Sequence, residues 1–302
     1  MMGGRFAAIA ALALLPAVAA RAQSSTAAAI SASSRTSQAT SGATVASSLS
    51  QTEKQDIGDI HPAASAGILS YFHGQATFNT QYVSNAPLYH SRDEADVLFA
   101  PAFEEGFTAP LNKYWKVNAD VRLEDFTYAS HQTLGFWGVS GDADIEYQYK
   151  PTYPRFYAGT EPYYYLSYAN GDRLTSAIGP VGGVDESISI NRGKTLLLLA
   201  DHFGQYFASP GPDTRATNSV TVALTQQIKP DLYAQLYYQY QYSKYTVFDR
   251  DENRSVVGLS LIHQITPVTF LSVFVNYADN ASNNSLAKYT TIDSGLSLVY
   301  QY

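Results

Sequence analysis

The chain closes with the stretch Ser294-Gly295-Leu296-Ser297-Leu298-Val299-Tyr300-Gln301-Tyr302, and this stretch decides the fold. Side chains of an extended strand alternate between its two faces. Leu296, Leu298, Tyr300 and Tyr302 therefore fall on one face, which is apolar and ends in aromatic residues. The other face carries Ser297, Val299 and Gln301, which are mostly small or polar. An apolar outer face opposite a largely polar inner face is typical of a strand in a membrane-embedded β-barrel.

The same stretch resembles the C-terminal assembly signal of bacterial outer-membrane β-barrel proteins. That signal ends on an aromatic residue, with an aromatic residue two positions earlier and apolar residues at further two-residue steps. The matching residues are Leu296, Leu298, Tyr300 and Tyr302. The resemblance implies that the outer-membrane assembly machinery inserts the chain through these residues. As architecture it covers residues 66–302, and it names no subfamily.

The composition is short of charge and rich in tyrosine. Hydrophobic residues make up 45% of the 302-residue chain, and only 15% of its residues are charged, against about 25% in soluble domains. The 24 tyrosines suit a membrane–water interface, because Tyr is apolar in its body and polar at its tip; secreted all-β proteins are also rich in Tyr. The absence of cysteine excludes a disulfide scaffold and a thiol nucleophile. The net charge of −7 argues against nucleic acid as a partner.

Two segments precede the expected barrel. A short basic start is followed by an apolar run and by the small-x-small site Ala20-Arg21-Ala22. This pattern predicts a secretory signal peptide over residues 1–22, cleaved near Ala22. Residues 23–65 are rich in Ser, Ala and Thr and carry no apolar stripe, so we expect a disordered periplasmic tail.

Period-two alternation begins near residue 66 and continues to the C-terminus. The pattern predicts an all-β fold, an antiparallel transmembrane β-barrel of about 12 strands over residues 66–302. Most of these strands are longer than the strands of globular sheets, which suits tilted strands that cross a bilayer. The strands are expected at 67–82, 91–103, 113–128, 135–149, 154–168, 180–190, 194–207, 217–229, 231–245, 254–265, 267–278 and 289–302.

Short and long connections alternate along this series. Turn residues such as those of Lys229-Pro230-Asp231 mark the short connections. In outer-membrane barrels the short turns are periplasmic and the long loops face outward, so an even strand count places both termini in the periplasm. Two segments fit less well: 104–112 is long for a short turn, and 170–179 is expected to be partly irregular. The long polar connections are expected at 84–90, 129–134, 208–218, 244–254 and 280–289.

Charge concentrates on one face of three successive expected strands, 113–128, 135–149 and 154–168. Inside a barrel these side chains would bring both signs of charge together on one wall. Three interpretations stay open: a polar pore wall or solute site, a salt-bridged filling that fixes strand register, and the solvated face of a soluble sheet. The candidate lumen residues are Lys116, Asp120, Arg122, Glu124, Asp142, Asp144, Glu146 and Glu161.

The functional prediction is a narrow outer-membrane channel for passive transport of small polar solutes, because 12 strands lie between filled 8-stranded and open 16-stranded barrels. One alternative is a non-conducting structural or surface-interaction barrel. Another is a secreted soluble β-sandwich that binds carbohydrate through Tyr163, Tyr164 and Tyr165. The histidines lack metal-ligand spacing and no G-x-S-x-G motif is present, so we expect no enzyme, cofactor or metal. The expected partners are outer-membrane lipid, the assembly machinery and a small polar solute, but no nucleic acid.

Overall fold

The computed structural model describes residues 71–302, apart from 89–93, 151, 170, 192 and 248. The predicted signal peptide, the predicted tail and the first residues of the expected barrel lie outside the described residues. In the described part of the chain, no helix is long and apolar enough to cross a membrane.

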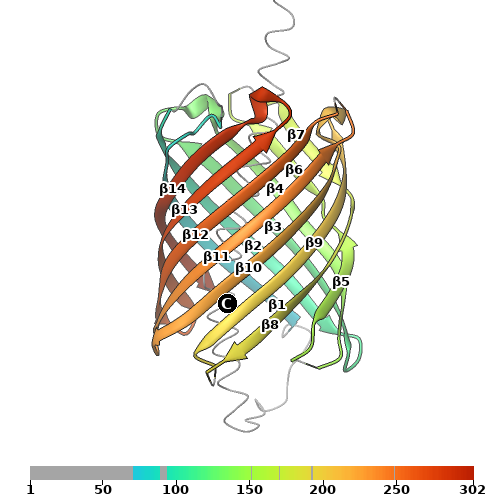
Figure 1. Cartoon of the computed structure of the whole chain (residues 1–302), viewed down its shortest axis with the longest axis vertical. Helices are drawn as coiled ribbons and strands as arrows, with labels where there is room; N and C mark the ends of the chain where they lie inside the picture. The colour runs from blue at the N-terminus through green and yellow to red at the C-terminus, as the bar shows by residue number, and fades with distance from the viewer. Residues whose placement is uncertain (1–70, 89–93, 151, 170, 192, 248) are drawn as a thin grey trace, which may run out of the picture.

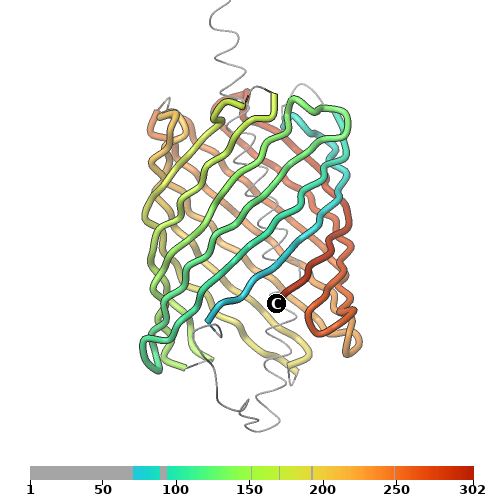
Figure 2. Tube along the Cα trace, turned by 180° about the vertical axis from the view of Figure 1, so that it is seen from behind, coloured from blue at the N-terminus to red at the C-terminus, as the bar shows by residue number. Residues whose placement is uncertain are grey.

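The strands form one sheet that closes into a barrel, and they are tilted relative to the barrel axis (Figure 1). Every neighbouring pair is antiparallel, and β1 pairs with β14 from Gln75↔Gln301 to Val83↔Asp293, which closes the wall (Figure 2). The strands are β1 (Phe72–Val83), β2 (Asp96–Pro110), β3 (Trp115–Tyr128), β4 (Phe136–Gln148), β5 (Arg155–Thr160), β6 (Tyr163–Ser167), β7 (Arg173–Ile178), β8 (Pro180–Ile190), β9 (Thr195–Ser209), β10 (Arg215–Lys229), β11 (Leu232–Tyr245), β12 (Asp251–Thr266), β13 (Thr269–Ser282) and β14 (Tyr289–Gln301).

Two of the wall's strands are interrupted, so the fourteen segments fill twelve positions, as the sequence predicted. Both β5 and β6 pair with β4, and both β7 and β8 pair with β9. Pro162, which lacks a ladder N–H, separates β5 from β6. Gly179 separates β7 from β8, and a Cβ there would lie 1.6 Å from the Gln205 carbonyl oxygen. Only glycine allows this close approach of two backbones.

Two predicted boundaries were wrong. The sixth strand of the wall begins at Arg173, not near residue 180, because 173–178 pairs with β6 and β9. The segment 104–112 is not a loop, because β2 continues to Pro110 opposite Lys116. The remaining turn is tight, and Asn112 Oδ1 accepts the N–H groups of Tyr114 and Trp115 at 2.8 and 3.2 Å.

The two rims of the barrel differ. One rim, here the short-turn end, carries the tight turns between β2 and β3 and between β10 and β11. The opposite rim, here the long-loop end, carries the three 3-10 helices, η2 (Gln132–Leu134), η3 (Gly211–Asp213) and η4 (Ser285–Ala287). Alternating connections therefore place the tightest turns, β10–β11 and β12–β13, at the same end.

The two faces of the wall also differ. In β3, Val121 and Leu123 are exposed on the outside, whereas Arg122 and Glu124 are buried on the inside. Exposed aromatic residues flank the outer apolar band: Trp115 and Tyr149 at the short-turn end, and Tyr82 and Trp137 at the long-loop end. An apolar band between two aromatic girdles is typical of barrels that sit in a bilayer.

Candidate functional site in the barrel interior

Charged side chains from five neighbouring strands line one side of the interior. The period of two places alternate residues of β3 and β4 inside, and their register brings Lys116 opposite Glu146 and Asp120 opposite Asp142. Strands β2, β5 and β8 and the β5–β6 junction add further charged groups. We call this set the charged wall: Glu104, Lys116, Asp120, Arg122, Glu124, Asp142, Asp144, Glu146, Arg155, Glu161 and Asp185.

Arg122 holds the buried part of the charged wall together. Its Nε lies 3.2 Å from a Glu124 carboxylate oxygen, and its Nη1 lies 3.2 Å from Glu104. The Tyr165 hydroxyl donates to the other Glu124 oxygen at 2.8 Å. The Glu124 side chain is only 1% exposed, so protein groups such as Arg122 and Tyr165, rather than water, stabilise its charge.

Nearer the short-turn end, the charged wall is open to water. Glu146 accepts from Lys116 Nζ at 3.4 Å and from Arg155 Nη1 at 3.0 Å. Arg155 also pairs with Asp185 at 2.8 Å. The side chains of Lys116 and Arg155 are 46% and 43% exposed. These two cations therefore border an accessible part of the lumen.

The structure places all eight predicted lumen residues on the inner face. Seven lie together on β3 and β4, and Glu161, at the β5–β6 junction, accepts from the Tyr206 hydroxyl at 2.5 Å. Sequence reasoning missed Glu104, Arg155 and Asp185. Glu104 fell in an expected loop, and the alternation in the other two strands was obscured by prolines and glycines.

The charged wall carries an excess of acid. Three cations, Lys116, Arg122 and Arg155, face eight carboxylates, which gives a formal charge of −5 when all are ionised. The opposite side of the interior is mostly neutral, with amide and hydroxyl pairs such as Gln235 to Thr225 at 3.1 Å and Tyr237 to Asn276 at 2.9 Å. The lumen is therefore asymmetric around its axis.

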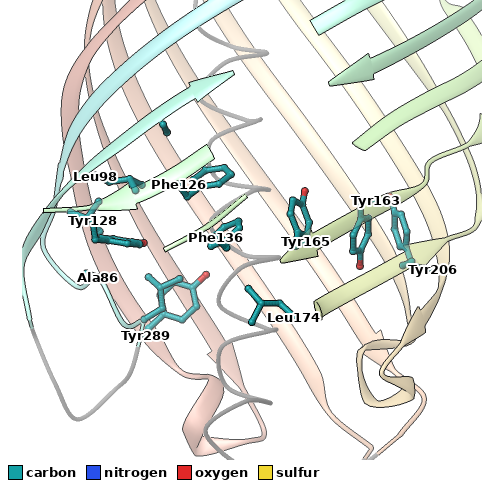
Figure 3. Packing of buried hydrophobic residues seen from close by; sticks show 14 of the residues in the cluster. Ala86, Leu98, Phe126, Tyr128, Phe136, Tyr163, Tyr165, Leu174, Tyr206 and Tyr289 are labelled. Atoms are coloured by element: carbon teal, nitrogen blue, oxygen red, sulfur yellow. The ribbon is translucent and has the colours of Figure 1, made fainter. Parts of the chain in front are cut away.

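An aromatic layer fills part of the interior toward the long-loop end (Figure 3). The rings of Phe126 and Phe136 stack with centroids 4.4 Å apart, and Tyr165 meets Phe136 edge-on at 5.6 Å. All three are about 1% exposed. We call this set the aromatic layer: Phe126, Tyr128, Phe136, Tyr163, Tyr165, Tyr206 and Tyr289.

The connection between β1 and β2 folds against the aromatic layer. Ala86 is 0% exposed and Leu88 is buried in the same cluster, while Asn85 Nδ2 donates to the Thr290 carbonyl at 3.1 Å. The sequence predicted a long polar loop here. The described part of that loop instead lies inside the barrel, where Ala86 and Leu88 pack against the inward-facing aromatic residues.

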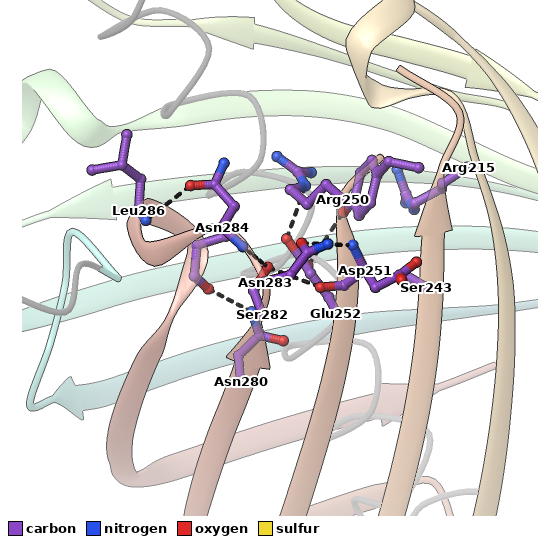
Figure 4. A network of polar contacts seen from close by, with 12 residues as sticks. Arg215, Ser243, Arg250, Asp251, Glu252, Asn280, Ser282, Asn283, Asn284 and Leu286 are labelled. Carbon is purple, nitrogen blue, oxygen red and sulfur yellow. Dashed lines mark hydrogen bonds and ion pairs between the residues drawn. The ribbon is translucent and has the colours of Figure 1, made fainter. Parts of the chain in front are cut away.

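A second polar network lies at the long-loop end on the β10–β12 side (Figure 4). The Arg250 guanidinium lies 3.5 Å from the centre of the Tyr245 ring, and its Nε is 3.1 Å from Glu252. Arg215 Nη1 donates to the Tyr163 hydroxyl at 3.1 Å. Arg254 is buried nearby. Sequence reasoning missed this network because it placed residues 244–254 in an outer loop.

The described residues hold no group of three or more His, Asp or Glu side chains placed to bind a metal ion. Tyr163 and Tyr165 are buried inside the barrel and only Tyr164 faces outward. The alternative of a soluble β-sandwich with these tyrosines as a carbohydrate platform was therefore wrong, since the sheet closes on itself.

The closed antiparallel wall, apolar outside and charged inside, defines a β-barrel of the bacterial outer-membrane type. No family model matches the chain, and no curated protein matches it. Among solved structures, it is similar to an outer membrane channel from Pseudomonas putida F1, with a TM-score of 0.53, 9% identity, and coverage of 81% of this chain and 100% of that chain. LpxR from Salmonella typhimurium also aligns, with a TM-score of 0.43, 8% identity, and coverage of 75% and 99%. At these identities the likeness shows the fold alone.

Proposed function

We propose that the protein resides in the bacterial outer membrane and forms a narrow channel for passive transport of small polar solutes. The outward apolar band with its two aromatic girdles supports a membrane location. The acidic excess of the charged wall favours cations over anions of the same size, because a like-charged lumen raises the cost of entry for anions. Catalysis forms no part of this proposal.

The observation that carries the proposal is the exposure of Lys116 and Arg155 inside the wall. Lys116 is the second residue of β3 and Arg155 the first of β5. Their exposure supports a water-filled entrance to the charged wall at the short-turn end. In this arrangement the partners are membrane lipid, the assembly machinery that inserts the chain, and the solute.

A second candidate, a non-conducting barrel, is favoured by the aromatic layer. Phe126, Phe136 and Tyr165 pack tightly, and the β1–β2 connection adds Ala86 to the same cluster. If this packing spans the lumen, ions cannot pass. The two candidates therefore differ on whether the aromatic layer narrows the path or closes it.

Single-channel recording in planar bilayers separates the two candidates. The channel proposal predicts discrete conductance for the wild-type barrel and a larger conductance for Phe136→Ala, which removes a ring from the aromatic layer. Asp142→Asn with Asp144→Asn should lower the ratio of cation to anion permeability measured from reversal potentials. A correctly folded barrel that stays silent in both wild-type and Phe136→Ala forms would support the non-conducting candidate.

A further inference from the structure

An acidic side chain lies close to the middle of the barrel's outer wall. Asp201 is the seventh of the 15 residues of β9 and is exposed. It lies on the outer face together with Leu199 and Phe203, which are 39% and 51% exposed. The aromatic girdles and both rims are therefore several residues away along the strand.

The strand register confirms that Asp201 lies about midway between the two rims. Because strands tilt in a barrel, residues paired across successive strands climb the wall. One such series of paired residues begins at Trp115 near the short-turn end and ends at Thr290 near the long-loop end. Asp201 lies four pairings from Trp115 and five from Thr290. The series runs through Trp115, Tyr147, Phe156, Val184, Asp201, Val220, Tyr240, Ser255, Asp279 and Thr290.

Asp201 accepts a hydrogen bond from a polar residue on this face. Asn218 Nδ2, on β10, donates to Asp201 Oδ1 at 2.9 Å. The residues paired with Asp201 on either side are Val184 and Val220, and Glu186, paired with Leu199, lies on the same face of β8. A carboxylate facing acyl chains at this depth is destabilising unless it gains further polar contacts.

The geometry points to a second copy of this chain as the partner that supplies those contacts. The hydrogen bond between Asp201 and Asn218 leaves one carboxylate oxygen and one amide N–H outside it. Across a two-fold axis along the barrel, each Asn218 could donate its second N–H to the Asp201 of the other copy. The polar pair is thus self-complementary, as an isologous interface requires.

Two small residues lie next to the polar pair, on the far side of the exposed Phe203 ring. Gly182 and Ala158 are paired with each other on the outer side of β8 and β5, and Gly182 is also paired with Phe203, two residues from Asp201. Small residues let backbones pack closely where polar side chains bond across a membrane interface. We define the dimer face as Ala158, Gly182, Asp201, Asn218 and Val220.

Cross-linking tests the dimer directly, because the chain has no cysteine of its own. Val220→Cys lies in the dimer face, and Phe78→Cys, 60% exposed on β1, lies on the opposite wall. Purified full-length variants are inserted into phospholipid vesicles and treated with a short bis-maleimide. The dimer predicts a covalent dimer for Val220→Cys and none for Phe78→Cys. Equal yields, or none at either site, would overturn it.

The role of the polar pair is tested in the Val220→Cys background. Asp201→Leu should raise the dimer dissociation constant about tenfold, whereas Asp201→Asn, which keeps a hydrogen-bonding side chain, should stay within about threefold of the parent. Unchanged cross-linking in Asp201→Leu would show that the pair does not hold the dimer. This inference rests on the proposed membrane location: protein that fails to float with vesicles overturns both, whereas inserted monomer overturns the dimer alone.

Discussion

Replacing Arg122 by leucine should strongly destabilise the barrel. The side chain is 9% exposed and bonds to Glu104 and Glu124 at 3.2 Å each. Arg122→Leu removes the guanidinium that pairs with the Glu124 carboxylate, which is 1% exposed. Breaking a buried pair costs about 3–5 kcal/mol in free energy of unfolding. Glu104 is 27% exposed and can turn to lumen water, so we expect the lower end of that range.

Lys116→Leu is the matched control on the same strand. Lys116 pairs with Glu146 at 3.4 Å but is 46% exposed, so its loss should cost only about 0–1 kcal/mol. Urea unfolding in vesicles reports both values through the emission of Trp115 and Trp137, the only two tryptophans. Adding Glu124→Gln to Arg122→Leu should recover part of the loss. Equal costs for the two leucine variants would refute the idea that burial determines the strength of these pairs.

Two further substitutions test packing and assembly. Gly138→Ala should lower the free energy of unfolding by about 1–3 kcal/mol, because its Cβ would lie 2.1 Å from the Tyr165 ring. Gly211→Ala is the control and should be neutral in the same urea assay, because its Cβ would have nothing within 4 Å. Tyr302→Lys should lower the amount of folded protein in outer-membrane fractions, measured by heat-modifiable gel mobility, because it places a charge at the end of the terminal strand. Leu286→Lys, at an exposed position of η4, is the control. Equal levels of the two variants would contradict an assembly role for Tyr302.

The alternation of side chains was enough to predict the wall. Strands such as β11, β12 and β13 bury alternate residues, and turn residues such as Pro230 and Asp231 separate the strands. The predicted strand boundaries were wrong where the alternation is interrupted. Pro162 and Gly179 interrupt two strands, and a proline or glycine alone does not indicate whether a strand ends there or continues beyond it.

The interior was less predictable, because alternation gives a residue's face but not its neighbours. Phe126 and Arg122 share a face of β3, yet one joins the aromatic layer and the other an ion-pair network. The difference arises from register, which places Phe136 opposite Phe126, and from the inward fold of Ala86. The ion pair between Arg155 and Asp185 likewise depends on the register between β5 and β8. The residues of either strand alone do not predict that register.

Single-channel recording of the folded, full-length barrel decides whether the lumen conducts. We predict discrete current steps across a planar bilayer, a reversal potential that favours cations, and larger steps when Phe136→Ala thins the aromatic layer. Inserted barrels that carry no current, in wild-type and Phe136→Ala alike, would contradict a conducting lumen.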